Sequence, residues 1–384
     1  MVKNFIKYLF VASLFCGCAV VTKSQQSVLP ADKNATKETI ALYKNLHRLK
    51  EKGFMFGHQD DLAYGVNWRY QKDRSDVKEV TGDYPAVYGW DLSGLEQFSE
   101  NNIDGVPFTK MRQYIKDGYN RGGVITLSWH FRSPSGAPNG AWDTTHGTVT
   151  SILPGGANHA LFKSWLDEGA KFISSLKGPK GEAIPILFRP FHELTGNWFW
   201  WCKNTCTDYE FTTLFRFVAY YLQHEKKLHN LLYVYNTTDN FKTKEEFLQR
   251  YPGDELIDVL SFDAYQFGDP LTNDWFVKNT NNLLHIIEEI ATQKNKLTAL
   301  AETGFEAIPY AAWWNEMLLK AIGDNKISYV LAWRNHGMNK AVTPARMHYY
   351  VPYKGQVSEK DFIQFYNLDK TLFEKDVNAE KLYQ

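Results

Sequence analysis

The sequence predicts a single-domain (β/α)8 barrel, and three observations support this fold class. Eight short apolar runs alternate with amphipathic helical patterns along the chain. The 384 residues exceed one domain of about 150 residues, but α/β barrels commonly reach this length as one domain. After residue 36 there is no internal repeat and no Pro-rich or Gly/Ser-rich linker. A doubly wound open sheet is the alternative, yet its phosphate-binding glycine patterns are absent.

Each predicted strand is a short apolar run that ends in polar or turn-forming residues. In order, the strands span residues 54–59, 85–92, 123–130, 183–193, 230–236, 258–265, 297–304 and 328–335. Between them, apolar residues recur at helical spacing, as in 40–49, 211–222 and 283–290. Gly178 and Gly323 follow such patterns and mark helix ends.

Composition narrows the class of ligand. The 43 basic and 43 acidic residues balance, so the basic excess of a nucleic-acid-binding protein is missing. No apolar stretch reaches the length of about 18 residues that a membrane span requires. The chain holds 12 Trp, 22 Tyr and 25 Phe, which together make 15% of it. Flat rings without surplus positive charge favour sugar ligands over nucleobases.

The N-terminus predicts export. Lys3 and Lys7 precede an apolar run, and small residues follow, so residues 1–19 are expected to form a signal peptide. Cys18 lies where a bacterial lipoprotein would be lipidated, and cleavage after Ala19 is the alternative. We therefore expect residues 20–35 to form a tether, residues 36–384 to form the domain, and the protein to reside in the cell envelope, with a lipid as its only membrane contact. Export also permits a disulfide between Cys202 and Cys206, which the sequence leaves open.

The predicted strand ends carry an unusual set of side chains. In a barrel, the carboxyl ends of the strands converge on one mouth, where function resides. Here these ends and the residues that follow them supply carboxylate, imidazole, guanidinium and aromatic groups: His58, Trp90, His130, Arg189, His192, Glu193, Tyr265, Glu302, Trp333 and Arg334.

Glu193 and Glu302, at the ends of the predicted fourth and seventh strands, are the strongest candidates for catalysis. Two facing carboxylates can cleave a glycosidic bond, with retention at a separation of about 5–5.5 Å and inversion at about 6.5–9.5 Å. Arg189 or Tyr265 can stabilise an anionic nucleophile, while the aromatic residues after Glu193 can keep an acid protonated. The alternative is that both glutamates only form ion pairs at the rim.

The segment 189–201 (RPFHELTGNWFWW) resembles the acid/base segment of glycoside hydrolase family 26, whose main members are β-mannanases. Further matches occur in the right order, namely GHQ at 57–59, GWD at 89–91, SWH at 128–130, SFDAY at 261–265, ETG at 302–304 and AWR at 332–334. The resemblance covers the chain from about residue 36 to its end.

The resemblance implies a role for each matched residue. Glu193 would be the acid/base and Glu302 the nucleophile of a retaining mechanism. His192 would position the nucleophile or the sugar 2-hydroxyl, and Tyr265 would donate a hydrogen bond to the nucleophile. Trp333 would lie under the sugar at the cleavage point, and His130 and Trp198 would contact substrate on either side. Further sugar contacts would be Arg334, His58 and Trp90.

Simpler structural roles stay open for several of these residues. Tyr265 and His58 could be buried and bonded to the backbone, and Arg189 could only neutralise the barrel interior. Residues 131–159 form a long polar segment without a clear helical pattern, and Trp142 within it is expected to form a wall of the cleft. No clustered metal-ligand pattern is apparent, and no cofactor is expected.

These inferences converge on a β-mannanase that hydrolyses β-1,4-mannosidic bonds in mannan, glucomannan or galactomannan, and on a monomer. The alternatives are a β-1,3-xylanase or mixed-linkage glucanase of the same family, an exo-acting enzyme that releases mannobiose, and a non-catalytic glycan-binding lipoprotein. The catalytic pair itself does not distinguish the enzymes.

Overall fold

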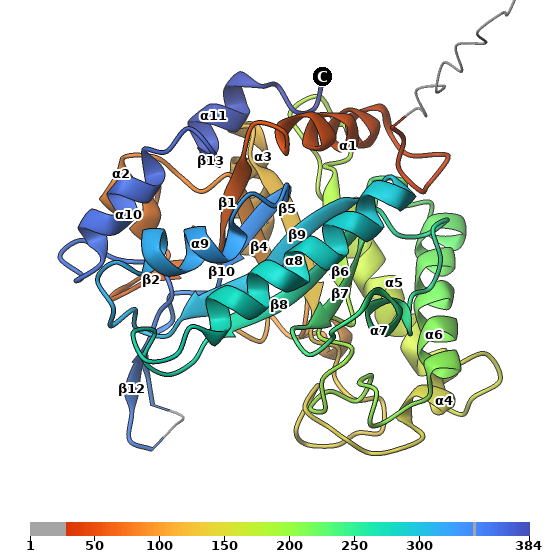
Figure 1. Cartoon of the computed structure of the whole chain (residues 1–384). Coiled ribbons are helices and arrows are strands. Elements are labelled where there is room, and N and C mark those ends of the chain that lie inside the picture. Colours follow the sequence, from red (N-terminus) through yellow and green to blue (C-terminus); the bar gives the residue numbers. More distant parts are fainter. Residues whose placement is uncertain (1–27, 341–342) are drawn as a thin grey trace, which may run out of the picture.

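The computed structural model describes residues 28–340 and 343–384, and its centre is a closed barrel of eight parallel strands (Figure 1). The barrel closes where β10 pairs with β1, with Met55 opposite Tyr329. The predicted fold class is confirmed. In chain order, the barrel strands are β1 (Phe54–Gln59), β4 (Val87–Asp91), β5 (Val124–Trp129), β6 (Ile186–Pro190), β7 (Leu231–Thr238), β8 (Val259–Gln266), β9 (Leu297–Phe305) and β10 (Tyr329–Ala332).

The predicted strands agree with these bounds to within three residues at each end, and the largest differences are in β6 and at the carboxyl end of β10. β1 has the predicted bounds, but β6 stops at Pro190 and not at Glu193. Phe191 and Glu193 have φ angles of 53°, in the left-handed region that strands do not use. Glu193 therefore lies in a turn directly after the strand. β10 likewise ends at Ala332, before Trp333 and Arg334.

Helices surround the barrel and bury one face each, as the periodicity predicted. α6 begins with a capping box in which Thr207 and Glu210 satisfy each other's backbone N–H groups. The helices are α1 (Lys37–Leu49), α2 (Asp76–Thr81), α3 (Phe108–Asn120), α4 (Thr148–Ile152), α5 (His159–Ser174), α6 (Asp208–Tyr220), α7 (Lys244–Leu248), α8 (Trp275–Lys294), α9 (Leu319–Ile322), α10 (Glu359–Tyr366) and α11 (Glu374–Ala379). Short 3-10 and π turns form η1 (Leu95–Gln97), η2 (Tyr221–Glu225) and η3 (Trp314–Leu318).

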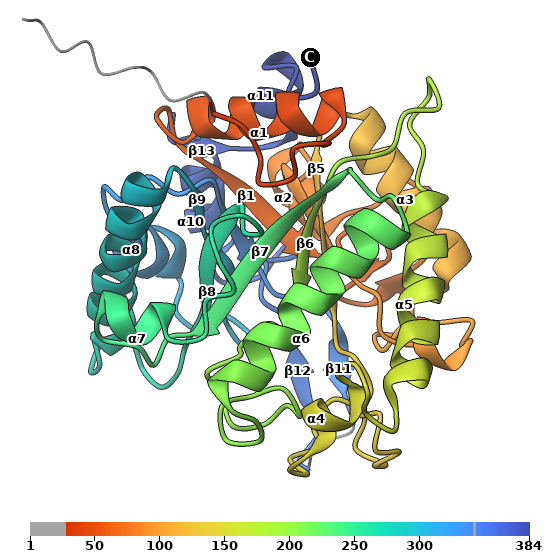
Figure 2. The same cartoon turned by 90° about the vertical axis from the view of Figure 1, so that its right-hand side faces the viewer.

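The amino end of the barrel is covered. α1 and α11 lie over it at the top of Figures 1 and 2, and the apolar face of α1 joins a buried cluster with the first residues of the strands. The backbone N–H of Ala31 donates to Asp258 at 2.7 Å, and Asp32 pairs with His229. The end of the predicted tether is thus docked on the domain, which begins before residue 36. The predicted signal peptide and Cys18 lie outside the described residues.

Several small elements lie outside the barrel. Two hairpins, β2 (Tyr64–Gly65) with β3 (Trp68–Arg69) and β11 (Gly337–Asn339) with β12 (Arg346–His348), were missed because each strand has at most three residues. The two-residue strand β13 (Thr371–Leu372) pairs with β1 outside the barrel. The long polar segment contains α4, so it is not wholly irregular. Across the described chain, no helix combines the length and apolarity that a membrane span needs.

Candidate active site

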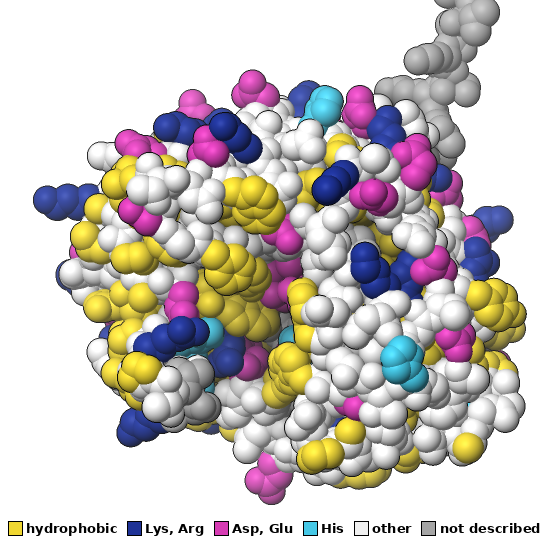
Figure 3. All heavy atoms as spheres, turned by 60° about the horizontal axis from the view of Figure 1, so that its bottom comes forward, with side chains coloured by type: hydrophobic (Ala, Val, Ile, Leu, Met, Phe, Trp, Pro, Cys, Tyr) yellow, Lys and Arg dark blue, Asp and Glu magenta, His cyan; other side chains and the backbone are white. Residues whose placement is uncertain are grey.

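A cleft of about 510 Å³ opens at the carboxyl end of the barrel. Figure 3 looks onto this end, where apolar and acidic side chains gather at a hollow near the centre of the face. The cleft is lined by His130, Trp142, His192, Glu193, Trp198, Phe199, Tyr265, Gln266, Phe267, Gly268, Glu302, Phe305, Glu306, Trp333, Arg346 and Tyr350. Of the twelve predicted site residues, eight therefore share one cleft: His130, Trp142, His192, Glu193, Trp198, Tyr265, Glu302 and Trp333.

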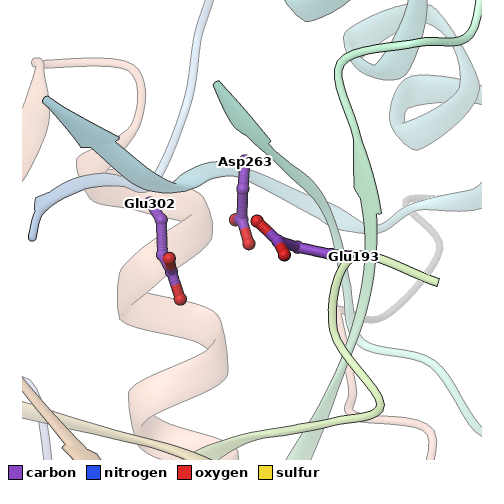
Figure 4. Close-up of side chains that lie close together, drawn as sticks. All are labelled: Glu193, Asp263 and Glu302. Carbon is purple, nitrogen blue, oxygen red and sulfur yellow. The ribbon is translucent and has the colours of Figure 1, made fainter. Parts of the chain in front are cut away.

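Three carboxylates converge within this site. One oxygen each of Glu193, Asp263 and Glu302 lies within 4.8 Å of the corresponding oxygens of the other two (Figure 4). The pairing of β8 with β9 shifts register after Phe262. This shift places Asp263 opposite Glu302, so the two residues lie side by side. The proximity of Glu193 and Glu302 fits the short separation of a retaining glycosidase, since an inverting pair must leave room for a water.

Both carboxylate oxygens of Glu302 accept a hydrogen bond. The Arg189 guanidinium donates to one carboxylate oxygen, and the Tyr265 hydroxyl donates to the other at 2.8 Å. Arg189 also donates to Asp263 at 2.9 Å, so one buried cation serves two carboxylates. These contacts fix the orientation of Glu302 and place a guanidinium and a phenol against it, partners that suit a carboxylate nucleophile.

Glu193 has the opposite environment. Burial in the cleft and the negative charge of Glu302 raise the pKa of Glu193 to about 7, although the indole N–H of Trp198 opposes this by donating to its carboxylate at 2.7 Å. Asn236 accepts the backbone N–H of Glu193 at 2.9 Å and donates to Asp263 at 2.8 Å. The two neighbouring carboxyl groups thus have different partners, an indole N–H for Glu193 and a guanidinium with a phenol for Glu302.

Hydrogen bonds from Arg250 and Trp201 hold the turn that carries Glu193. Arg250, which is 1% exposed, donates to the carbonyl oxygens of Leu194 and Trp201 at 2.9 and 3.2 Å. The indole N–H of Trp201 donates to the carbonyl oxygen of His192 at 2.8 Å. Trp201 is fully buried and packs the loop beneath the cleft.

His130 and His192 lie beside the carboxylates and contact each other. Their Nε2 atoms are 3.0 Å apart, and Nδ1 of His130 is 2.7 Å from Asp91. The ring of Trp142 stacks on His130 with a centroid distance of 5.3 Å, and Phe199 packs against both imidazoles. Trp142 therefore forms part of the cleft wall.

Some of the predicted contacts are wrong. Trp90 is fully buried and stacks on Tyr114 of α3, so it packs between the barrel and its helices and does not reach the cleft. His58 is 1% exposed and bonds to Asp61 at 2.7 Å, which gives it the structural role left open above.

Arg189 lies behind the cleft, where it acts on Glu302. Arg334 pairs with Asp104 at 3.1 Å and is not among the lining residues, so its contact with sugar stays a prediction.

The possible disulfide is not formed, because Cys202 and Cys206 are free thiols. The sulfur of Cys202 points to the carbonyl oxygen of Glu193, and that of Cys206 lies 2.8 Å from the Arg250 guanidinium. The two sulfurs therefore have separate partners.

Several site residues were given no role from the sequence, among them Asp263, Asn236 and Tyr350. Asp263 had a usable signal, since it lies two residues before Tyr265 on the same strand and side chains two apart share a face. Asn236 ends a predicted strand and could have been found in the same way. Tyr350 follows β12 and only tertiary structure brings it to the cleft.

A barrel with two neighbouring glutamates in an aromatic cleft, one of them with a raised pKa, defines the class of glycoside hydrolases. The profile of glycosyl hydrolase family 26 matches residues 31–352, and the chain belongs to this family. This confirms the resemblance noted from the sequence.

Solved structures and curated relatives agree with this assignment. A family 26 β-mannanase from Bacteroides ovatus is 43% identical with a TM-score of 0.85, covering 91% of this chain and 98% of that one. An endo-β-1,4-mannanase catalytic domain from Bacillus sp. JAMB-750 is 30% identical with a TM-score of 0.84, covering 94% and 97%. A mannan endo-1,4-β-mannosidase from Bifidobacterium adolescentis is 32% identical over 373 residues, which cover 92% of this chain but 36% of that protein. The chain thus spans about a third of that relative's length.

Proposed function

We propose that this protein is a β-mannanase that hydrolyses β-1,4-mannosidic bonds in mannan, glucomannan or galactomannan with retention of configuration. The observation that carries the proposal is the close approach of Glu193, with its raised pKa, to Glu302, to which Arg189 and Tyr265 donate hydrogen bonds. The β-mannanases and mannan endo-1,4-β-mannosidase described above support the choice of substrate.

In the first step, the Glu302 carboxylate attacks the anomeric carbon of the sugar at the cleavage point. The bond from that carbon to the glycosidic oxygen breaks, and Glu193 gives its proton to the departing oxygen. The product is a glycosyl ester on Glu302 and a shortened sugar chain. Negative charge leaves Glu302 as the ester forms, while Arg189 remains paired with Asp263 at 2.9 Å.

In the second step, Glu193 is a carboxylate and acts as a base. It takes a proton from water, whose oxygen attacks the same anomeric carbon and displaces Glu302. Two inversions give net retention, and both glutamates return to their starting protonation. Because one residue serves first as acid and then as base, a pKa near neutrality suits Glu193 in both steps.

The aromatic residues of the cleft provide the surfaces for sugar rings. Pyranose rings present apolar C–H faces and polar edges, which match flat indoles surrounded by hydrogen-bonding groups. Trp333, Trp198 and Trp142 line the cleft beside His130 and His192. This arrangement suits a β-linked polysaccharide better than a small charged substrate.

The test is to incubate purified protein with mannan, glucomannan, β-1,3-xylan and lichenan, and to follow the products over time. Activity confined to the mannans is expected, and the length of the early products distinguishes endo from exo cleavage. Proton NMR of the first product should show the β-anomer, since an α-anomer would contradict retention. Glu302→Ala should lose at least about 1,000-fold in kcat while still binding manno-oligosaccharides. Binding without turnover by the native chain would instead indicate a glycan-binding protein.

We further propose that the protein is an exported monomer, anchored in the cell envelope by a lipid on Cys18. The charged, apolar and small segments of residues 1–19 support export, and the small residue before Cys18 supports lipidation. The full-length chain should fractionate with membranes, whereas Cys18→Ala should be released. Equal retention of both would contradict the lipid anchor. Light scattering of the released chain measures the oligomeric state.

A further inference from the structure

A chain of three buried side chains ends at the catalytic cleft. Asp91, at the carboxyl end of β4, is fully buried and lies 2.7 Å from Nδ1 of His130. His130, directly after β5, brings its Nε2 to 3.0 Å from Nε2 of His192. His192 lines the cleft beside Glu193. No role for Asp91 follows from the sequence, and Asp91 takes no part in the catalytic steps above.

The distances restrict where the protons can be. A carboxylate only accepts hydrogen bonds, so Nδ1 of His130 carries a proton. One proton must also lie between the two Nε2 atoms. If His130 is doubly protonated, it donates and His192 keeps its own proton on Nδ1. If His130 is neutral, His192 must donate from Nε2, and its Nδ1 is bare. The direction of this one hydrogen bond therefore sets the tautomer of His192.

The surroundings of Asp91 favour the first arrangement. Its oxygens accept from the Ser128 hydroxyl at 2.7 Å and from the backbone N–H of Ser93 at 2.8 Å. Burial opposes the charge of Asp91, but His130 and these donors outweigh it and lower the pKa of Asp91. Burial likewise opposes the His130 cation, but the Asp91 carboxylate outweighs it and raises the pKa of His130. Both therefore favour a buried ion pair.

The other charged groups around the histidines act in the same direction. Glu302 on β9 and Asp104 before α3 add negative charge near His130. Burial, the His130 cation and the Arg189 guanidinium together hold the pKa of His192 well below its ordinary value. His192 thus stays neutral, next to Glu193, which must keep its proton for the first step.

Nδ1 of His192 is buried and has no hydrogen-bond partner among the described residues. A buried N–H without a partner costs about 1–3 kcal/mol. In the opposite tautomer the same atom would be an acceptor without a partner. The direction of the His130–His192 hydrogen bond therefore decides whether this nitrogen of a cleft-lining residue is a donor or an acceptor.

We infer that Asp91 is a positioning residue of the active site, which keeps His130 doubly protonated so that His130 donates to Nε2 of His192 and holds the His192 proton on Nδ1. Asp91 acts through two histidines and touches no substrate. Without its carboxylate, a buried His130 becomes neutral and the hydrogen bond reverses.

The first test measures the tautomer of His192 by NMR in protein with 15N-labelled histidine, using His192→Gln to assign its signals. In the native chain near pH 6, we expect a protonated Nδ1 and an unprotonated Nε2 on His192. In Asp91→Asn we expect the proton of His192 to move from Nδ1 to Nε2. In the native chain we expect the same change as pH rises through the pKa of His130. A proton on Nε2 of His192 in the native chain near pH 6 would overturn the inference. The native titration needs no variant, so misfolding of Asp91→Asn cannot hide the answer.

The second test is kinetic, and its interpretation rests on the proposed mannanase activity. An amide N–H of glutamine can donate to Nε2 of His192 without help from a carboxylate. We therefore expect Asp91→Asn to lower kcat about 10- to 100-fold in the native background, but less than about twofold in the His130→Gln background. Equal losses in both backgrounds would mean that Asp91 acts only through folding.

A matched control separates these effects from the loss of any buried carboxylate. Glu374, in α11 at the covered end of the barrel, accepts from Tyr88 and Arg121. Glu374→Gln should leave the His192 tautomer and kcat unchanged. If the protein proved inactive on every glycan, the NMR experiment would still decide the inference, so its failure and that of the proposed function are distinguishable.

Discussion

The indole N–H of Trp198 donates a hydrogen bond of 2.7 Å to the carboxylate of Glu193 in the same loop. This contact opposes burial and the charge of Glu302, which together raise the pKa of Glu193 to about 7. Without this hydrogen bond the pKa of Glu193 would be higher, and the protonated form would persist to higher pH. The contact therefore keeps the pKa of Glu193 close to neutral pH.

The pH dependence should follow from this contact. Glu193 must be protonated in the first step, so kcat/KM should fall as pH rises through about 7. Trp198→Phe removes the donor that favours the ionised form, so the pKa of Glu193 should rise and the alkaline limb should move to higher pH. Measuring kcat/KM against pH for both proteins tests this. A shift to lower pH, or none, would contradict the role of the indole N–H.

Replacement of the acid should affect substrates unequally. Glu193→Ala should lower kcat on mannan at least about 100-fold, because the departing sugar oxygen needs a proton. An aryl mannoside with an acidic phenol as its leaving group needs little protonation, so its glycosylation step should be largely spared. Burst kinetics with the aryl substrate can measure that step separately. Equal losses on both substrates would assign the proton donor elsewhere.

Arg189 should be essential for stability as well as activity. Arg189→Met leaves Asp263 and Glu302 without their cation, and breaking such a buried pair costs about 3–5 kcal/mol of the free energy of unfolding. Arg189→Lys retains the charge but cannot bridge two carboxylates as a planar fork does, so kcat/KM should fall about 10- to 100-fold with a smaller loss of stability. Urea unfolding and steady-state kinetics test both variants. A fully active Arg189→Lys would show that charge alone suffices.

Two tryptophans that the sequence placed in the same role should now behave differently. Trp333→Ala removes a lining surface of the cleft and should weaken binding of a manno-oligosaccharide by about tenfold, as expected for loss of about 1.4 kcal/mol. Trp90→Phe changes a fully buried ring and should alter stability but not binding. Calorimetric titration and thermal unfolding separate the two outcomes. Weaker binding in Trp90→Phe at unchanged stability would mean that Trp90 contacts the substrate.

Much of this site was predictable because parallel strands order the chain in space. The carboxyl ends of eight strands meet at one mouth, so Glu193 and Glu302 could be paired without any structure. The aromatic run after Glu193 likewise predicted a dry environment for the acid.

What failed was the assignment of side-chain direction near strand ends. Trp90 and Trp333 both follow apolar runs, but one side chain turns to a helix and the other to the cleft. Periodicity does not resolve this for a strand buried on both faces, where every position is apolar. The short hairpins and the role of Asp91 were also beyond reach, because they depend on contacts between segments far apart in sequence.

Arg250 has a consequence for the dynamics of the enzyme. A loop that carries a catalytic group is often a part that opens and closes, with backbone amides that exchange readily with solvent. Here one buried guanidinium donates to carbonyl oxygens at both ends of the loop and stacks on Phe211 with a distance of 4.3 Å from its central carbon to the ring centroid. These contacts should hold the loop in one conformation, so the amides of Gly196 and Trp200, which donate to the carbonyl oxygens of Glu193 and Ala141, should exchange slowly. The acid is then already in place when the polysaccharide arrives, and no closing step need precede the chemistry.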